Sequence, residues 1–139
     1  MQILLTHSNQ YKIGAVGNAE SCESLDMLMA IGANYQASAD GLFELLERIS
    51  QEGLSNISTK LSHRVDENEN IYELIKGKLR LFYFKTEEDF LIICTSALIK
   101  KSQAVDPKHV KKAIRLKHEY LQAVKQNTLI VIEENENGD

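Results

Sequence analysis

Cysteine and proline are scarce in this sequence, and long apolar runs are missing. The two cysteines, Cys22 in a polar stretch and Cys94 in an apolar one, provide neither a disulfide framework nor a paired metal motif, which favours the reducing cytoplasm. No segment reaches the roughly 18 apolar residues that span a membrane. The opening residues MQILLTHSNQYK also lack the basic start and apolar run of a signal peptide. We therefore expect a soluble chain with no membrane partner.

Motifs of established catalytic or cofactor chemistry are also missing from the sequence. It contains no glycine-rich phosphate loop, no His and Cys spacing typical of a metal site, and no local Ser/His/Asp set. It contains no internal repeat either. We expect neither a cofactor nor a metal ion.

Positive charge is concentrated in one part of the chain. The formal net charge is -4, yet residues 1–71 carry 4 Lys and Arg against 10 Asp and Glu, whereas residues 72–125 carry 12 against 6. Residues 126–139 carry 4 carboxylates and no Lys or Arg. Such asymmetry favours a surface that binds nucleic acid or another polyanion. Lysines that only keep exposed faces soluble are the alternative.

Length and helical periodicity predict one α+β domain with three helices. At 139 residues and 43% hydrophobic, the chain can bury a single core. Apolar spacing predicts a short helix in SLDMLMAI, closed by Gly32, and a longer amphipathic helix capped by Ser38 and ended by Gly53. Asp106 as N-cap and Pro107 at the first helical position predict the start of a third helix.

Strands are predicted mainly in the middle of the chain. IYELIK and KLRLFYFK flank Gly77, and FLIICTSALIK is apolar enough to be a central strand buried on both faces. Together these segments predict a meander. Weaker strands are expected in QILLTHSNQYKI and in LIVI near the end. Residues 54–70 are expected to be a loop with at most one short strand, in which His63 and Arg64 are solvated.

Several cations are expected to gather on this meander. Alternate residues of a strand share a face, so Lys78, Arg80 and Phe82 should point one way. The other face should carry Leu79, Leu81 and Tyr83. Lys76 lies across the turn, and the Lys100–Lys101 pair ends the next strand. Such a cluster binds phosphates by charge, and arginine adds bidentate hydrogen bonds. Exposed lysines that discourage pairing at a sheet edge are the alternative.

A basic cluster is also compatible with RNA cleavage. Breaking RNA through its ribose 2′-hydroxyl needs a base for that hydroxyl, positive charge for the transition state and an acid for the departing oxygen. Lysine can serve as the base only if neighbouring cations lower its pKa. A site without a catalytic His, Glu or metal is therefore physically possible.

The order of several segments resembles a known family. These are the amphipathic helix LFELLERISQEG, then YEL, then GKLRLFYF with Arg80, then a strand ending in Lys100-Lys101, then a helix opened by Asp106-Pro107 that carries Ala113 and Tyr120. Over roughly residues 42–121, they resemble the phage-type HigB branch of the RelE/ParE superfamily, the toxins of bacterial toxin–antitoxin systems.

This resemblance implies a fold and a domain organisation. The fold would be a small α+β domain in which an antiparallel β-sheet of three to four strands packs against N-terminal helices and one long C-terminal helix. Residues 1–139 would form a single toxin domain, with an extended N-terminal segment 1–40 and an acidic tail 133–139. The segment 1–40 exceeds what the resemblance explains, and we expect it to add a helix, a lid or a dimer surface. The tail is expected to be disordered.

The resemblance also implies a function and partners. A toxin of a type II system in the RelE and HigB branches enters the ribosomal A site and cuts mRNA, which inhibits translation and arrests growth. The implied partners are the ribosome, mRNA and a cognate antitoxin protein that neutralises the toxin. The ParE branch shares the fold, poisons DNA gyrase and lacks the nuclease residues. A gyrase inhibitor, or an inactive homologue that only binds, is therefore the alternative.

Site residues are carried over from the resemblance by position. Arg80 corresponds to the strand arginine at the scissile phosphate, Lys101 to the basic residue ending the next strand, and Lys76 to the basic residue before the hairpin turn. These three are the implied catalytic residues. The implied RNA-binding residues are Lys78, Lys100, Lys108 and Lys111.

Two further positions have weaker support. His109 and Tyr120 lie on the third predicted helix. We favour a helix-surface position for His109 and a helix-packing aromatic for Tyr120.

Overall fold

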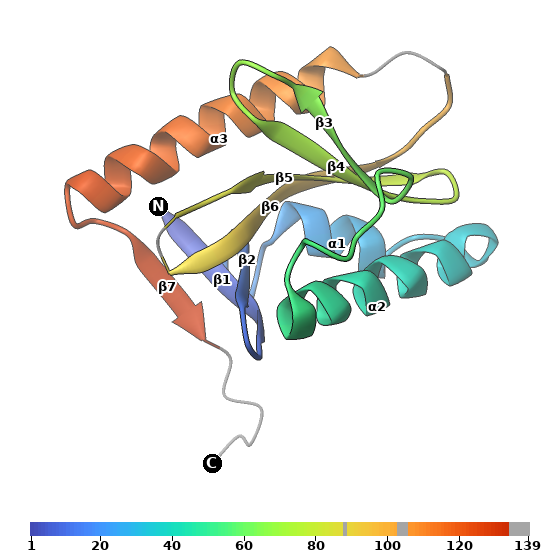
Figure 1. Ribbon diagram of the computed structural model, residues 1–139, viewed down its shortest axis with the longest axis horizontal. Coiled ribbons are helices and arrows are strands. Elements are labelled where there is room, and N and C mark those ends of the chain that lie inside the picture. The colour runs from blue at the N-terminus through green and yellow to red at the C-terminus, as the bar shows by residue number, and fades with distance from the viewer. Residues whose placement is uncertain (88, 103–105, 134–139) are drawn as a thin grey trace.

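The computed structural model describes residues 1–87, 89–102 and 106–133. Within these residues the chain forms seven strands, three α-helices and a short 3-10 helix η1 (Figure 1). The strands are β1 Gln2–Ser8, β2 Lys12–Val16, β3 Ser62–Asp66, β4 Ile71–Lys76, β5 Leu79–Lys85, β6 Phe90–Ile99 and β7 Ile130–Glu133. The helical elements are α1 Glu23–Met29, η1 Ala33–Tyr35, α2 Gln36–Glu52 and α3 Pro107–Lys125.

The seven strands of the described residues form one mixed sheet in the order β3-β4-β5-β6-β2-β1-β7. The small antiparallel sheet predicted from the sequence is therefore wrong for this chain. The predicted meander β4-β5-β6 is present and β3 joins it, but β2 pairs in parallel with β6, and β7 pairs in parallel with β1. The helix α3 does not end the described chain, because β7 follows it at the weak strand expected in LIVI.

The N-terminal hairpin explains part of this difference. The segment predicted as one weak strand forms two strands, β1 and β2. The register of the β1–β2 pairing shifts between Leu5 and His7, as at a β-bulge. Of the segment 1–40, the hairpin widens the sheet and α1 packs against β6. The predicted disordered tail falls mostly on residues 134–139, which lie outside the described residues.

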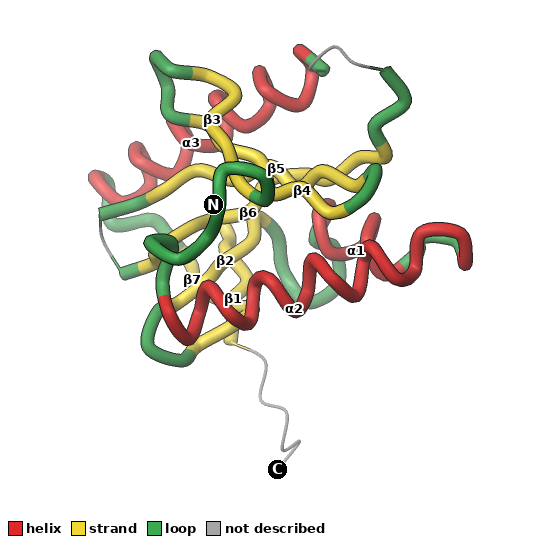
Figure 2. The backbone as a smooth tube through the Cα atoms, turned by 45° about the vertical axis from the view of Figure 1, so that its right-hand side comes forward, coloured by secondary structure: helices red, strands yellow, loops and turns green. Residues whose placement is uncertain are grey.

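Helices cover both faces of the sheet. Figures 1 and 2 show α1 and α2 on one side and α3 on the other. One apolar cluster joins the first two helices to the sheet through residues such as Leu28, Leu42 and Leu81. A second cluster joins α3 to the opposite face through residues such as Ala113, Tyr120 and Phe84. The two faces of the sheet, one against α1 and α2 and the other against α3, can therefore hold side chains of different chemistry.

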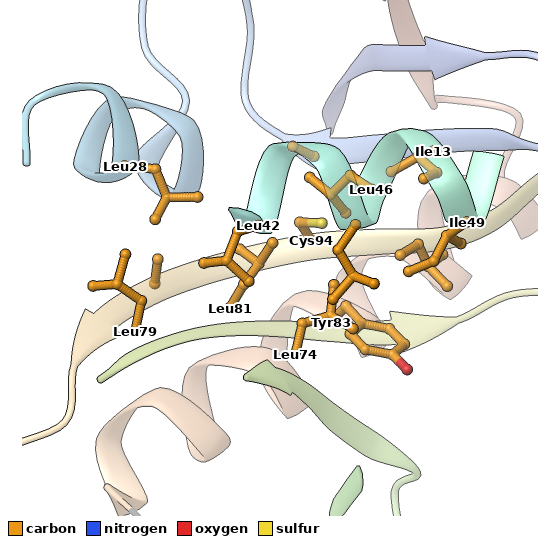
Figure 3. Packing of buried hydrophobic residues seen from close by; sticks show 14 of the residues in the cluster. Ile13, Leu28, Leu42, Leu46, Ile49, Leu74, Leu79, Leu81, Tyr83 and Cys94 are labelled. Atoms are coloured by element: carbon orange, nitrogen blue, oxygen red, sulfur yellow. The ribbon is translucent and has the colours of Figure 1, made fainter. Parts of the chain in front are cut away.

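The helix α2 packs by the stripe that the sequence predicts. Leu42, Leu46 and Ile49 are fully buried and point at the sheet, toward Leu81 and Tyr83 (Figure 3). Complete burial of such side chains contributes about 1.5–3 kcal/mol each.

The predicted ends of α2 are half right. Gly53, with φ 84°, ends the helix as predicted. The predicted N-cap Ser38 is wrong, since α2 begins at Gln36. The Ser38 hydroxyl lies instead against the turn at Gly77, where an added Cβ would come within 2.5 Å of it. This contact packs the β4–β5 turn against α2.

The start of α3 is as predicted. Asp106 accepts a hydrogen bond from the backbone N–H of Lys108 at 2.9 Å, and Pro107 occupies the first turn. This start brings the first turn of α3 to the end of β6.

No helix in the described part of the chain is both long and apolar enough to cross a membrane.

Two buried groups predict a loss of stability in alkali. Burial raises the pKa of the Tyr83 phenol from 10.0 to about 12, and it raises the pKa of the Cys94 thiol from 9.0 to about 12. The folded state therefore keeps protons that the unfolded chain releases, so the free energy of unfolding should fall as pH rises above about 9, by about 1.4 kcal/mol per pH unit for each titrating group. Urea unfolding between pH 8 and pH 10.5 measures this loss. Tyr83→Phe should lose less stability than the natural chain at the upper end of this pH range. An unchanged dependence of the free energy of unfolding on pH would contradict the assignment to Tyr83.

Candidate functional site

A pocket opens on the α3 side of the sheet, where β4, β5 and β6 meet the beginning of α3. Its volume is about 440 Å³. Apolar parts of Phe82, Leu98 and Ile99 form part of its wall. The charged residues that line it are Glu73, Arg80, Lys100, Lys101, Asp106 and Lys108.

The pairing of the strands explains which side chains lie at the centre of this pocket. Glu73 of β4 is paired with Phe82 of β5, and Arg80 of β5 is paired with Leu98 of β6. Neighbours paired across a sheet share a face, so all four side chains point to the α3 side. Ser96 of β6 is paired with Phe82, so its side chain lies on that same side.

Glu73 is a buried carboxylate at the base of the pocket. It is only 3% exposed. Its Oε1 lies 3.3 Å from Nε2 of His63 and 3.8 Å from Nε of Arg80. A buried carboxylate is costly unless cations or donors compensate it, and these two residues do so here.

Arg80 is held in a fixed orientation. Its Nη1 donates to the backbone oxygens of Gly77 at 2.8 Å and Leu79 at 2.9 Å. Its Nε is buried without a hydrogen-bond partner among the described residues, although the Glu73 carboxylate lies near it. An arginine fixed through Nη1 can present Nη2 to a bound oxyanion without having to order its side chain first.

The pocket gathers four of the seven basic residues proposed from the sequence. Arg80, Lys100, Lys101 and Lys108 all line it. The backbone N–H of Lys100 donates to the backbone oxygen of Lys78 at 2.7 Å, which fixes the end of β6 beside the β4–β5 turn.

The other three residues lie outside the pocket lining. Lys76 is paired with Leu79, whose side chain is in the α2 cluster, so Lys76 points to the face opposite Arg80. Its methylenes cover Gly41 of α2, where an added Cβ would lie 2.6 Å from Lys76 Cε. Lys78 is exposed in the turn, and Lys111 is exposed one turn further along α3.

His109 and Tyr120 have different surroundings. Nδ1 of His109 lies 2.7 Å from the hydroxyl of buried Ser96, and its ring stacks on Phe82 with centroids 5.5 Å apart. The helix-surface prediction for His109 is therefore wrong. Tyr120 is buried, with its ring tilted against Phe84, which confirms it as a packing aromatic.

Glu73 and His63 are the site residues that the sequence reasoning missed. His63 was predicted in a solvated loop, but it lies on β3 opposite Glu73. A signal for Glu73 was present in the sequence. It alternates with Ile71 and Ile75 in β4, which places a carboxylate at a position facing the same side as two apolar residues.

No group of three or more His, Cys, Asp or Glu side chains among the described residues is arranged to hold a metal ion. The polar groups in and beside the pocket are its cations, its buried carboxylate and the nearby imidazoles of His63 and His109.

Residues 31–118 match the model of the family described as Phage derived protein Gp49-like (DUF891). The chain belongs to this family. The match spans more than half of the chain and includes the whole of α2 and the strands β3 to β6, which build most of the pocket. The Gp49-like family is associated with toxins of toxin–antitoxin systems, and this suggests an antitoxin as partner. No curated protein matched the chain.

Proposed function

We propose that the chain is a toxin that cuts mRNA on the ribosome. The observation that carries this proposal is that four cations, from β5, from the residues just after β6 and from α3, line one pocket together with a buried carboxylate. Positive groups bind the phosphate backbone, and a carboxylate beside them can move a proton. Dependence on the ribosome is supported by the resemblance to the HigB branch.

Phosphate binding would be divided among the cations of the pocket. Arg80 would bind the scissile phosphate, since its guanidinium is already oriented. Lys100 and Lys108, which also line the pocket, would bind flanking phosphates. The exposed Lys78 and Lys111 would extend this binding along the RNA backbone.

The proposed cleavage is a transfer within the RNA. The ribose 2′-hydroxyl gives its proton to Glu73 and forms a bond to phosphorus, while the bond from phosphorus to the 5′-oxygen breaks. The ammonium of Lys101 protonates that leaving oxygen. The products are a 2′,3′-cyclic phosphate and a 5′-hydroxyl. Glu73 replaces Lys76 in the role of base because Lys76 points to the other face.

The lysine pair at the end of β6 provides the test. The double variant Lys100→Ala/Lys101→Ala should cut mRNA on translating ribosomes at least about a hundredfold more slowly, because it loses both phosphate binding and the proposed acid. Lys125→Ala, at the far end of α3, removes a similar charge and should cut at the natural rate. Cleavage is measured with purified ribosomes and a labelled message.

Two outcomes would contradict this function. Equal rates for the natural chain and the double variant would remove the lysines from the site. Inhibition of DNA supercoiling by gyrase, with intact mRNA, would favour the gyrase-directed alternative.

A further inference from the structure

The two helical layers of the molecule have opposite charge. Within α1 and α2 there are six Asp and Glu and one Arg, whereas α3 carries six Lys and Arg and one Glu. These layers cover opposite faces of the sheet (Figure 2). RNA is attracted to the α3 layer and repelled by the other layer, so the acidic side is available for a different kind of partner.

A second pocket, of about 490 Å³, lies on this acidic side. It is formed by β1, α1, the loop before α1, one residue of α2 and one of β7. Apolar side chains that line it include Leu4, Leu25, Met29 and Phe43. Met29 is 73% exposed, more than any other large apolar residue in the described part of the chain. An apolar pocket with an exposed apolar side chain at its edge is typical of a site where another protein binds.

The rim of this pocket is negative. Its charged residues are Asp26 and Glu133, and no Lys or Arg lines it among the described residues. Asp26 is fixed there because its carboxylate accepts a hydrogen bond from the backbone N–H of Cys22 at 2.9 Å. His7 also lines the pocket, and burial lowers its pKa, which favours the neutral imidazole.

We propose that this acidic-rimmed pocket binds a basic segment of a partner protein, which inserts an apolar side chain and places Lys or Arg against the rim. Charge complementarity selects this occupant, because apolar burial supplies the anchor and the carboxylates select the flanking charge. Of the lining residues, only Phe43 lies within the stretch that matches the family model. The surface therefore goes beyond the proposed RNA cleavage and does not depend on it. A partner bound there would leave the RNA pocket open.

Three labelled peptides of equal length test this proposal by fluorescence anisotropy. The first has a Leu-Leu-Phe centre flanked by lysines, the second has glutamates in place of the lysines, and the third keeps the lysines but has serines at its centre. Only the first should bind the full chain saturably, with at least about tenfold weaker binding for the other two. Its affinity should fall as salt is raised.

Two matched variants locate the binding. Met29→Lys adds a positive charge to the rim and should weaken binding of the first peptide at least about tenfold. Leu121→Lys makes the same kind of change at an exposed apolar position on α3 and should bind as the natural chain does. Circular dichroism checks that both variants fold.

Several results would overturn the proposal. They are no saturable binding of the first peptide, equal binding of all three peptides, and unchanged binding by Met29→Lys. Self-association of the free chain that Met29→Lys abolishes would also overturn it, because a second copy would then be the occupant. None of these results bears on RNA cleavage, which is measured separately.

Discussion

Replacing Arg80 with alanine should abolish the growth arrest caused by induced expression of this chain in a bacterium without the antitoxin. Arg80 is the one arginine of the described pocket, and backbone oxygens already fix its guanidinium. Loss of such an oriented charge at the scissile phosphate should slow cleavage by about 10²–10³-fold. Colony counts after induction measure the effect. Arg80→Lys keeps the charge but loses the planar fork, so we expect partial toxicity.

Lys76→Ala is the matched control for this prediction. Lys76 lies one β-hairpin turn from Arg80 but points toward α2. The variant should therefore remain toxic. Arg80→Ala is also expected to destabilise the fold, because the buried Glu73 keeps only His63 beside it, so its thermal melting is compared with that of Arg80→Lys. Full toxicity of Arg80→Ala, or harmless expression of Lys76→Ala, would contradict the assignment of the site.

Changes at Glu73 should separate a structural role from a catalytic one. Glu73→Ala leaves the largely buried Arg80 without its carboxylate and should lower the free energy of unfolding by about 3 kcal/mol. Glu73→Gln keeps the shape and an acceptor oxygen but cannot take a proton. Its cleavage rate should fall by about 10²–10⁴-fold with a smaller loss of stability. Urea unfolding and single-turnover cleavage on ribosomes measure the two effects.

Glu119→Gln is the matched control for Glu73. It makes the same chemical change at an exposed carboxylate that pairs with Arg115, four residues before it on α3. Neither stability nor cleavage should change measurably, since exposed pairs contribute little. If Glu73→Gln cuts mRNA at the natural rate, Glu73 only compensates Arg80, and another group must be the base.

Local signals in the sequence predicted much of the framework. The strands around Gly77, the apolar β6 and the capped start of α3 all follow from patterns within a few residues. The same alternation predicted that Arg80 points away from Leu79 and Leu81, which is how β5 lies.

The wider sheet could not be predicted from such signals. β7 pairs with β1 across more than a hundred residues of chain, and β2 pairs with β6, so neither pairing has a local signature. The extra residue of β6 after the Phe82 pairing was not predicted either. Ser96, which is paired with Phe82, contacts His109, and the sequence gives no sign of that contact.

Lys76 is close to Arg80 in the sequence but lies on the opposite face of the sheet. A two-residue turn pairs Lys76 with Leu79, so the two residues share a face and Lys76 is separated from Arg80. Counting the register across the turn would have predicted this. By contrast, the contact between His63 and Glu73 needed the position of β3, which has weak periodicity.

Mapping of mRNA 5′ ends shortly after induction tests the proposed RNA cleavage most directly. The natural chain and Arg80→Ala are expressed in parallel without the antitoxin. We expect new ends inside translated messages with the natural chain and none with the variant. Growth arrest with intact mRNA, or the same cuts in both strains, would contradict the assignment of RNA cleavage to this pocket.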